Sequence, residues 1–292
     1  MGSARVGQLL SASDRAAVDA LLAEVERASG RPPLSDHLRL DYAAGGGPGF
    51  TAALVEDDRG LVGYGQASVA HDSSSIEVVL RPDADAGVEA DLLRSLRRSV
   101  SGPLFWWVHG ADDTHDAIAA ELGMSADRRL LQLRRELPIG ADAGVSTRPF
   151  VVGSDEEAWL AVNNRAFAWH PEQGGWDLDT LQTREAESWF DPDGFLLHER
   201  DGRLAAFCWT KLHPATTLDP ALGEIYVIAV DPDFGGLGLG RAMTIAGLDS
   251  IAAHGVTTGM LFVDESNAAA LGLYVKLGFH THRVDVAFRS DG

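Results

Sequence analysis

The chain has 292 residues, 45% of which are hydrophobic, and it carries a formal net charge of −19. This length suits one large domain or two of ordinary size, and the composition is that of a globular protein with a core. So acidic a chain is not expected to bind nucleic acid or an anionic membrane, whereas it favours cationic substrates such as amines.

The single cysteine points to a reducing compartment, because no intramolecular disulfide is possible. Cys208 lies in an apolar run, which predicts a buried core residue rather than a catalytic thiol. The sequence shows no targeting pattern and no apolar run that approaches about 18 residues. We therefore expect a cytoplasmic protein with no membrane contact, and we take a monomer as the working hypothesis.

The predicted elements of the first half begin with a β-hairpin. Residues 53–64 read as strand, turn and strand, and Val78–Leu80 forms a further strand that ends at Arg81-Pro82. A short acidic loop, residues 83–89, follows this strand. Farther on, residues 129–137 are expected to close the first half as its last strand.

The second half repeats this order after a linker. Residues 138–147 are rich in Gly, Ala, Pro and Asp, which is a linker composition. Residues 195–207 again read as a hairpin with an Asp-Gly turn, and residues 282–288 are expected to close this half. The repeat predicts two tandem domains of one fold, residues 1–140 and 145–292.

A strand, a glycine-rich turn and a helix follow one another in Glu224–Arg241. The apolar strand ends at Asp231-Pro232, four glycines lie between positions 235 and 240, and a helical pattern continues to Ala253. Backbone N–H groups at such a helix start can bind a pyrophosphate, and glycine lets the phosphates reach them. The stretch lacks the features of the dinucleotide fingerprint and of the P-loop.

A second motif lies downstream, in Asn267–Phe279. Asn267 is expected to cap a helix, and Tyr274 lies two turns farther along on the same face. Gly278 is expected to end the helix, and Phe279 to open a strand, as in the Leu122-Gly123-Met124 segment of the first half.

These two motifs resemble the acetyl-CoA loop and the following helix of the GNAT acetyltransferase superfamily, although Gly235 stands where that family usually has Gln or Arg. The resemblance implies an α/β (α+β) fold in which each domain is a mixed, mainly antiparallel twisted sheet flanked by helices. It also implies acetyl-CoA as co-substrate and Tyr274 as the acid that protonates the departing thiolate; the alternative is a core tyrosine. The residues implied to bind acetyl-CoA are Ile228, Ala229, Val230, Gly235, Gly236, Leu237, Gly238, Leu239, Gly240, Arg241, Asn267, Ala268, Ala269, Ala270, Leu271 and Gly272.

Only the second half carries these motifs. The acidic loop 83–89 would place carboxylates beside a pyrophosphate, which costs about 1 kcal/mol per close pair even in water. By alignment on the prolines, Ser74 stands at the position of Glu224 and Ala119 at that of Tyr274. We therefore expect the first domain to be inert and to bind CoA weakly or not at all.

Further segments resemble the mycothiol synthases, a family of tandem GNAT enzymes. They cover nearly the whole chain in the right order: PLSDH (33–37), WWVHG (106–110), LQLRREL (131–137), AFAWHPEQG (166–174), WTKLHP (209–214) and GEIYVIAVDP (223–232). The family uses acetyl-CoA to acetylate the cysteinyl amine of cysteinyl-glucosaminyl-inositol (desacetylmycothiol), giving mycothiol and CoA. The residues implied to bind this substrate are Asp36, Glu172, Lys211, Glu224 and Phe262.

Two of these residues depart from the family pattern. Phe262 stands where the family usually has a tyrosine, and loss of one hydrogen bond would weaken substrate binding by about 1 kcal/mol or mark an altered substrate. Asp36 replaces a glutamate and shortens its reach by one methylene. Taken alone, Asp36 and Glu172 read as solvated acids in loops, and His170 is an alternative base.

The expected reaction is direct transfer, with Glu224 as the base that deprotonates the amine and a backbone N–H of Ile228–Val230 polarising the thioester carbonyl. The ten histidines show no metal-ligand spacing, so no metal is expected. Two alternatives stay open. One is a GNAT enzyme that acetylates another amine, such as an aminoglycoside or a peptide N-terminus, and the other is a non-catalytic acetyl-CoA sensor.

Overall fold

The computed structural model describes residues 4–70, 73–169, 173–216 and 218–291. The chain divides into two compact units. Unit 1 consists of residues 1–130, 216–218 and 283–292, and unit 2 of residues 131–215 and 219–282. Over the described residues, no helix combines the length and the apolar character that crossing a membrane requires.

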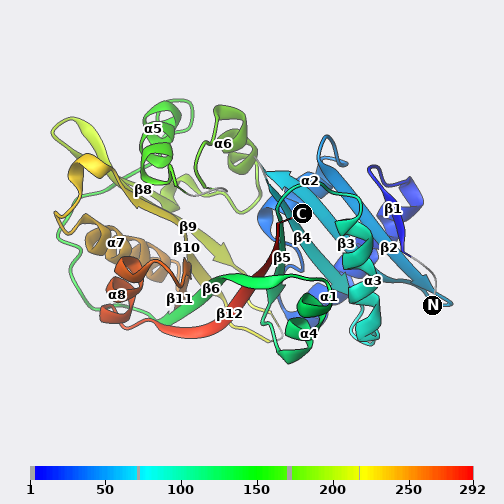
Figure 1. The fold of residues 1–292 in the computed structure, drawn as a ribbon. Coiled ribbons are helices and arrows are strands. Elements are labelled where there is room, and N and C mark those ends of the chain that lie inside the picture. The colour runs from blue at the N-terminus through cyan, green and yellow to red at the C-terminus, as the bar shows by residue number, and fades with distance from the viewer. Residues whose placement is uncertain (1–3, 71–72, 170–172, 217, 292) are drawn as a thin grey trace. The chain divides into compact units, whose positions relative to one another are not determined.

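Unit 1 is a mixed sheet with helices on both faces (Figure 1). Its elements are β1 (Arg5–Gly7), α1 (Ala12–Ser29), α2 (Asp36–Ala43), β2 (Phe50–Asp57), β3 (Gly60–Ala70), β4 (Ser73–Leu80), α3 (Ala86–Arg97), β5 (Leu104–His109), α4 (Asp113–Glu121) and most of β12 (His280–Ser290). The strand order is β1-β2-β3-β4-β5-β12, in which β4 and β5 run parallel and the other neighbours run antiparallel.

Each face of this sheet has its own apolar core. Leu21 of α1 and Leu38 of α2 pack with Tyr64 and Val79 on one face. α3 and α4 cover the other face, where Ile76 lies in the core. Successive strand residues point to opposite faces, which is why neighbouring strand positions enter different cores.

Unit 2 repeats this plan (Figure 1). Its elements are the second part of β6 (Ser125–Glu136), β7 (Arg148–Pro149), α5 (Glu156–Ala166), α6 (Leu178–Glu185), the 3₁₀ turn η1 (Pro192–Gly194), β8 (Phe195–Arg200), β9 (Arg203–His213), β10 (Leu222–Val230), the 3₁₀ turn η2 (Pro232–Phe234), α7 (Leu239–Ala253), β11 (Thr258–Asp264) and α8 (Ala268–Lys276). The strand order is β6-β11-β10-β9-β8-β7, with β10 and β11 parallel and the pairs from β10 to β7 antiparallel.

The two faces of the unit 2 sheet carry different helices. Trp159 of α5 and Leu181 of α6 pack with Trp209 on one face. α7 lies against the other face, where two glycines permit close approach. A Cβ at Gly223 would lie 2.0 Å from Ile251 Cγ2, and one at Gly247 would lie 2.4 Å from Cys208 Sγ.

The repeated hairpins and helix ends are confirmed. β2 pairs with β3, and β8 with β9, whose turn residues Asp201 and Gly202 have φ of 54° and 72°. Positive φ at both positions is the backbone of a tight hairpin turn. Gly123 and Gly278 likewise follow the ends of α4 and α8 with φ of 66° and 82°.

Both predicted closing strands exist, but the prediction of which sheet each one joins is wrong. β12, which contains residues 282–288, pairs antiparallel with β5 of unit 1, with Asp285 opposite His109. Residues 131–136 of β6 belong to unit 2 instead. The alternation of apolar and polar residues predicts that a segment forms a strand. The neighbour with which it pairs depends on sheet edges that are formed by residues distant in the sequence.

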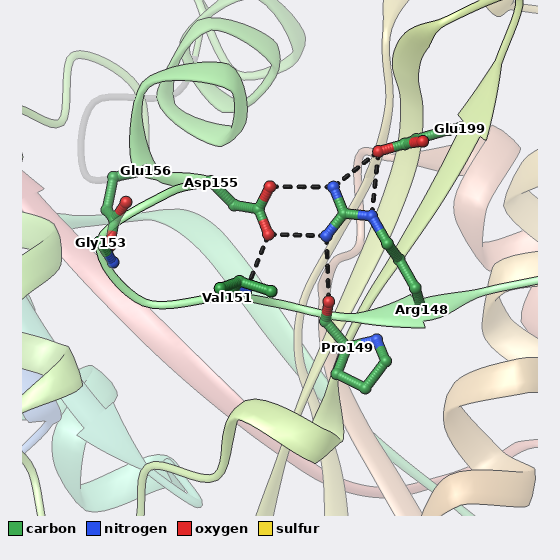
Figure 2. A network of polar contacts seen from close by, with 7 residues as sticks. All are labelled: Arg148, Pro149, Val151, Gly153, Asp155, Glu156 and Glu199. Atoms are coloured by element: carbon green, nitrogen blue, oxygen red, sulfur yellow. Dashed lines mark hydrogen bonds and ion pairs between the residues drawn. The ribbon is translucent and has the colours of Figure 1, made fainter.

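An ion-pair network anchors β7, which follows residues 138–147 in unit 2. Figure 2 shows Arg148 between two carboxylates: its Nη atoms lie 2.6 and 2.9 Å from the Asp155 oxygens, and Nη2 lies 2.6 Å from Glu199 Oε1. The Val151 amide donates to Asp155 at 2.8 Å. Hydrogen bonding from Arg148 lowers the pKa of Asp155 despite its burial. These contacts join β7 to β8 and to the residue before α5.

Candidate active site

The candidate site begins where β10 and β11 separate. Within the described residues, parallel pairing joins Gly223–Ile225 to Gly259–Leu261, while β10 continues to Val230. The backbone of Ile228–Val230 beyond the last pair can therefore hydrogen-bond an extended ligand on the β11 side.

A β-bulge in β10 lies at the same point. Ile225 pairs with Thr210 and Val227 with Trp209, so that Tyr226 is an additional residue in the strand. Bulges of this kind redirect side chains and end pairing, and they are frequent beside active sites. Here the bulge keeps the Tyr226 ring on the Trp209 side, with the ring centroids 5.3 Å apart.

Glu224 immediately precedes the separation of the strands. It is 8% exposed, and its register partner on β9 is Lys211. The Glu224 Oε2 atom lies 2.7 Å from Nε2 of His213. Because His213 lies two residues from Lys211 on the same strand, both side chains reach the face that carries Glu224.

Lys211 is held against two aromatic rings. Its Nζ lies 4.4 Å from the centroid of Trp189 and 5.2 Å from that of Tyr226. Such cation–π contacts stabilise a partly desolvated ammonium. The buried lysine is therefore held over these rings at the β9 position that pairs with Glu224.

The glycine-rich turn leads directly into α7. Gly236 and Gly238 both have φ of 77°, and a Cβ at either position would meet no atom within 4 Å, so backbone conformation rather than space favours glycine. The first turn of α7, which the structure describes in full, contains no acidic residue and has no side-chain cap. Its first N–H groups are therefore open to an anionic ligand.

Ion pairs fix the chain just before this turn. Asp231 is 2% exposed, accepts a hydrogen bond from the Asp233 amide at 2.9 Å and lies 3.0 Å from Nη1 of Arg165. Arg165 and Arg203 also contact Asp233, at 2.8 and 2.7 Å. These contacts link α5 and β9 to η2, just before the glycine-rich turn.

The start of α3, the counterpart of α7 in unit 1, is already capped. The Asp85 carboxylate accepts a hydrogen bond from the Gly87 amide at 2.8 Å, and Glu89 lies in the first turn. A carboxylate occupying the helix N-terminus competes with a phosphate for the same N–H groups.

Tyr274 lies on α8, whose start is confirmed. The Asn267 side chain accepts a hydrogen bond from the Ala270 amide at 3.1 Å and so caps this helix. Tyr274 is 7% exposed, and its ring centroid lies 5.7 Å from that of Phe279. Burial, together with the nearby Cys208, raises the pKa of the Tyr274 hydroxyl. The hydroxyl therefore stays protonated at neutral pH, as a proton donor must.

The remaining predicted residues differ in how far the structure places them. Glu172 and the alternative base His170 lie outside the described residues. Asp36 belongs to unit 1, where it is the first residue of α2, with its Oδ1 3.8 Å from Arg39 Nε. The expectation that Asp36 lies in a loop was wrong. Phe262 is half-buried on β11.

Sequence reasoning missed the side chains that surround Glu224 and Lys211. His213 lies in the WTKLHP segment, but no role was assigned to it, and Trp189 and Tyr226 were not considered. The available signal was the two-residue spacing of Lys211 and His213 on a predicted strand. The contact with Glu224 also depends on the β9–β10 register, which the sequence does not give.

The bulge corrects one comparison between the halves. β4 pairs with β3 from Ser73 to Leu80, all described, with no register shift. Because Tyr226 is an extra residue, it must be left out when positions are counted back from Pro82 and Pro232. Ser75 rather than Ser74 then corresponds to Glu224. The position in unit 1 still holds a serine, which cannot act as a carboxylate base.

Comparisons with known proteins place the chain in a family. Residues 160–279 match the acetyltransferase (GNAT) family. The fold is similar to that of a GCN5-related N-acetyltransferase from Sphaerobacter thermophilus (TM-score 0.70, 20% identity, 100% of this chain and 96% of that one). A tandem GNAT protein from the clavulanic acid biosynthesis pathway is also similar (TM-score 0.68, 17% identity, 99% and 98% covered). The chain is thus an α/β protein with the GNAT fold.

The curated relatives define the family more narrowly. A mycothiol acetyltransferase from Kocuria rhizophila is 43% identical, with 93% of this chain and 95% of that protein covered. Mycothiol acetyltransferases from Thermomonospora curvata (45% identity, 93% and 92% covered) and Streptomyces griseus (39%, 97% and 94%) are similarly related. The chain belongs to the mycothiol acetyltransferase family.

Proposed function

We propose that the chain transfers the acetyl group of acetyl-CoA to the cysteinyl amine of cysteinyl-glucosaminyl-inositol, giving mycothiol and CoA. The observation that carries this proposal is the position of Glu224. A buried carboxylate lies at the point where β10 and β11 separate, on the strand that leads into an uncapped, glycine-rich helix start. The name that the relatives share, mycothiol acetyltransferase, supports mycothiol as the product.

The acetyl-CoA pyrophosphate would bind the N–H groups between Gly235 and Arg241. Loop amides and Arg241 supply the local positive potential that an anion needs on a chain of net charge −19. The pantetheine arm would pair with Ile228–Val230, where β10 extends beyond its last pair with β11. A backbone N–H of the same segment would polarise the thioester carbonyl. The first turn of α8, Asn267–Gly272, would form the opposite wall.

Glu224 and Tyr274 would move the protons of the reaction. The amine arrives mainly as an ammonium, so a carboxylate can both hold it and remove a proton, directly or through water. Attack on the thioester carbon then forms the C–N bond and breaks the C–S bond. The Tyr274 hydroxyl, which is protonated at neutral pH as tyrosines ordinarily are, would donate to the departing sulfur.

The sugar-inositol part of the substrate would be bound by polar side chains. Lys211, fixed over Trp189 and Tyr226, can donate to its hydroxyls. Asp36 and Glu172 would accept from them, and Phe262 would supply shape without a hydroxyl. We propose no catalytic role for unit 1, because Asp85 caps α3 and serine replaces the base. We place the enzyme in the cytoplasm as a monomer that needs no metal.

The test is a mass-spectrometric assay of purified protein with acetyl-CoA and three separate amines. These are cysteinyl-glucosaminyl-inositol, an aminoglycoside and a short peptide with a free N-terminus. We expect acetylation of the first alone. Acetylation of one of the others instead would keep the acetyl transfer and overturn the substrate, and bound acetyl-CoA without any product would favour a sensor.

A further inference from the structure

The proposed reaction leaves one surplus proton in a buried site at every turnover. The substrate nitrogen enters as an ammonium and ends as an amide, so it loses two protons as the C–N bond forms. One of these two protons replaces the proton that Tyr274 gives to the CoA sulfur when the C–S bond breaks. The other must leave the protein, because a protonated Glu224 cannot act as a base again.

We infer that His213 carries this surplus proton from Glu224 to solvent. The inference rests on the proposed function and assigns His213 as a positioning and relay residue that acts through Glu224. Its Nε2 lies 2.7 Å from Glu224 Oε2, which is the distance of a strong hydrogen bond to a carboxylate.

The exposure of the two side chains gives the relay its direction. The Glu224 side chain is 10% exposed, whereas that of His213 is 25% exposed. With its own proton on Nδ1, the imidazole accepts the proton of the Glu224 acid at Nε2 and releases the Nδ1 proton to water. Proton number is conserved at each step, and rotation or exchange of the ring proton restores the starting tautomer.

Two substitutions separate proton relay from support of the fold. His213→Gln keeps a side chain that can donate to Glu224 but cannot carry a proton, and His213→Ala leaves space for a small base. The matched control is His254→Ala, which removes another unit 2 histidine near a carboxylate, with Nε2 3.8 Å from Asp191 Oδ2. Acetyl-CoA affinity and circular dichroism show whether each variant is folded.

The measurement is the steady-state rate of acetylation of cysteinyl-glucosaminyl-inositol, with and without added imidazole, beside the wild type. We expect kcat to fall by roughly tenfold to a hundredfold in both His213 variants. Added imidazole should restore His213→Ala in a concentration-dependent way, without effect on His213→Gln, the control or the wild type. Relay also predicts a larger solvent isotope effect on kcat in His213→Gln.

Two results would overturn the inference. One is an unchanged kcat in either folded variant, and the other is a loss in His213→Ala that imidazole does not restore. If His213→Ala does not fold, His213→Gln decides through its kcat and its isotope effect. A wild type that makes no product would instead refute the proposed function, so the two failures are distinguishable.

Discussion

At the scale of single residues, the site depends on groups whose chemistry is set by their surroundings. Glu224 is buried beside His213 and opposite Lys211, and Lys211 is held by aromatic rings. Glu224, Lys211 and Tyr274 were assigned to the site from the sequence because they fall within recognisable segments. His213 was not, because its contact arises from the pairing of two strands.

Replacing the hydroxyl of Tyr274 tests the proposed acid. We expect Tyr274→Phe to lower kcat by roughly a hundredfold and to leave the acetyl-CoA dissociation constant unchanged, because the ring stays and only the proton donor is lost. Steady-state kinetics and calorimetric titration measure the two quantities.

Tyr64→Phe is the matched control for this substitution. Tyr64 is another buried tyrosine, in unit 1, and its hydroxyl donates to Gln66 at 2.8 Å. Its loss should lower the free energy of unfolding by about 1 kcal/mol without changing kcat. Equal kcat for Tyr274→Phe and the wild type would exclude Tyr274 as the acid.

At the scale of elements, the start of α7 and the bulge of β10 are what distinguish unit 2 from unit 1. Both units carry the same order of strand, turn and helix, but α3 begins with a capping carboxylate and α7 begins with a glycine. The motif pattern was enough to predict the hairpins, the helix N-cap at Asn267 and the glycine turn. The bulge was not predictable, because one extra strand residue leaves no local signal and shows only in the register.

A capping carboxylate introduced at α7 should reproduce the state of α3. We expect Gly238→Asp to weaken acetyl-CoA binding by tenfold or more, because its carboxylate would occupy the helix N–H groups and repel the pyrophosphate. Gly238→Asn is the control, since both side chains tolerate the positive φ of 77° at this position and differ mainly in charge.

Titration calorimetry with acetyl-CoA measures the effect. The asparagine variant should bind at least several times more tightly than the aspartate variant. Equal affinities of the two variants would show that the first turn of α7 does not hold the phosphates.

At the scale of the whole molecule, the two tandem units exchange a strand segment each. β12, at the end of the chain, completes the sheet of unit 1, and residues 131–136 join the sheet of unit 2. The tandem repeat was readable from the sequence because the hairpins and helix ends recur. The exchange was not, since the residue pattern of a strand does not specify which sheet the strand joins.

The exchanged strand β12 brings the buried carboxylate of Asp285 to unit 1, and this carboxylate makes the free energy of unfolding depend on pH. Burial would raise the pKa of Asp285, but hydrogen bonds from His109 and Arg283 outweigh it and lower the pKa to about 2. A carboxylate whose pKa is lower in the folded state than in the unfolded state, where it is near 3.9, stabilises the fold at pH values above about 3.9. The contribution, roughly 2 kcal/mol, is lost as pH falls from about 4 towards 2.

Asp285→Asn should therefore unfold more readily than the wild type at pH 7, and the difference should shrink as pH approaches 2. Denaturant melts between pH 2 and 7 measure it. Asp291→Asn is the control. The Asp291 side chain is 82% exposed, and its ion pair in the described part of the chain is with the exposed Arg289. A difference that stays constant across this range would show that Asp285 does not titrate with folding.

The most direct test of the account is acetyl transfer by Glu224→Gln, measured beside the wild type with acetyl-CoA and cysteinyl-glucosaminyl-inositol. Glutamine keeps the shape of the side chain and removes the base. We expect the wild type to form the acetylated product, and the variant to bind acetyl-CoA equally well while kcat falls by roughly a hundredfold or more. A variant as active as the wild type would show that the carboxylate at the separation of β10 and β11 is not the base, and would contradict the account.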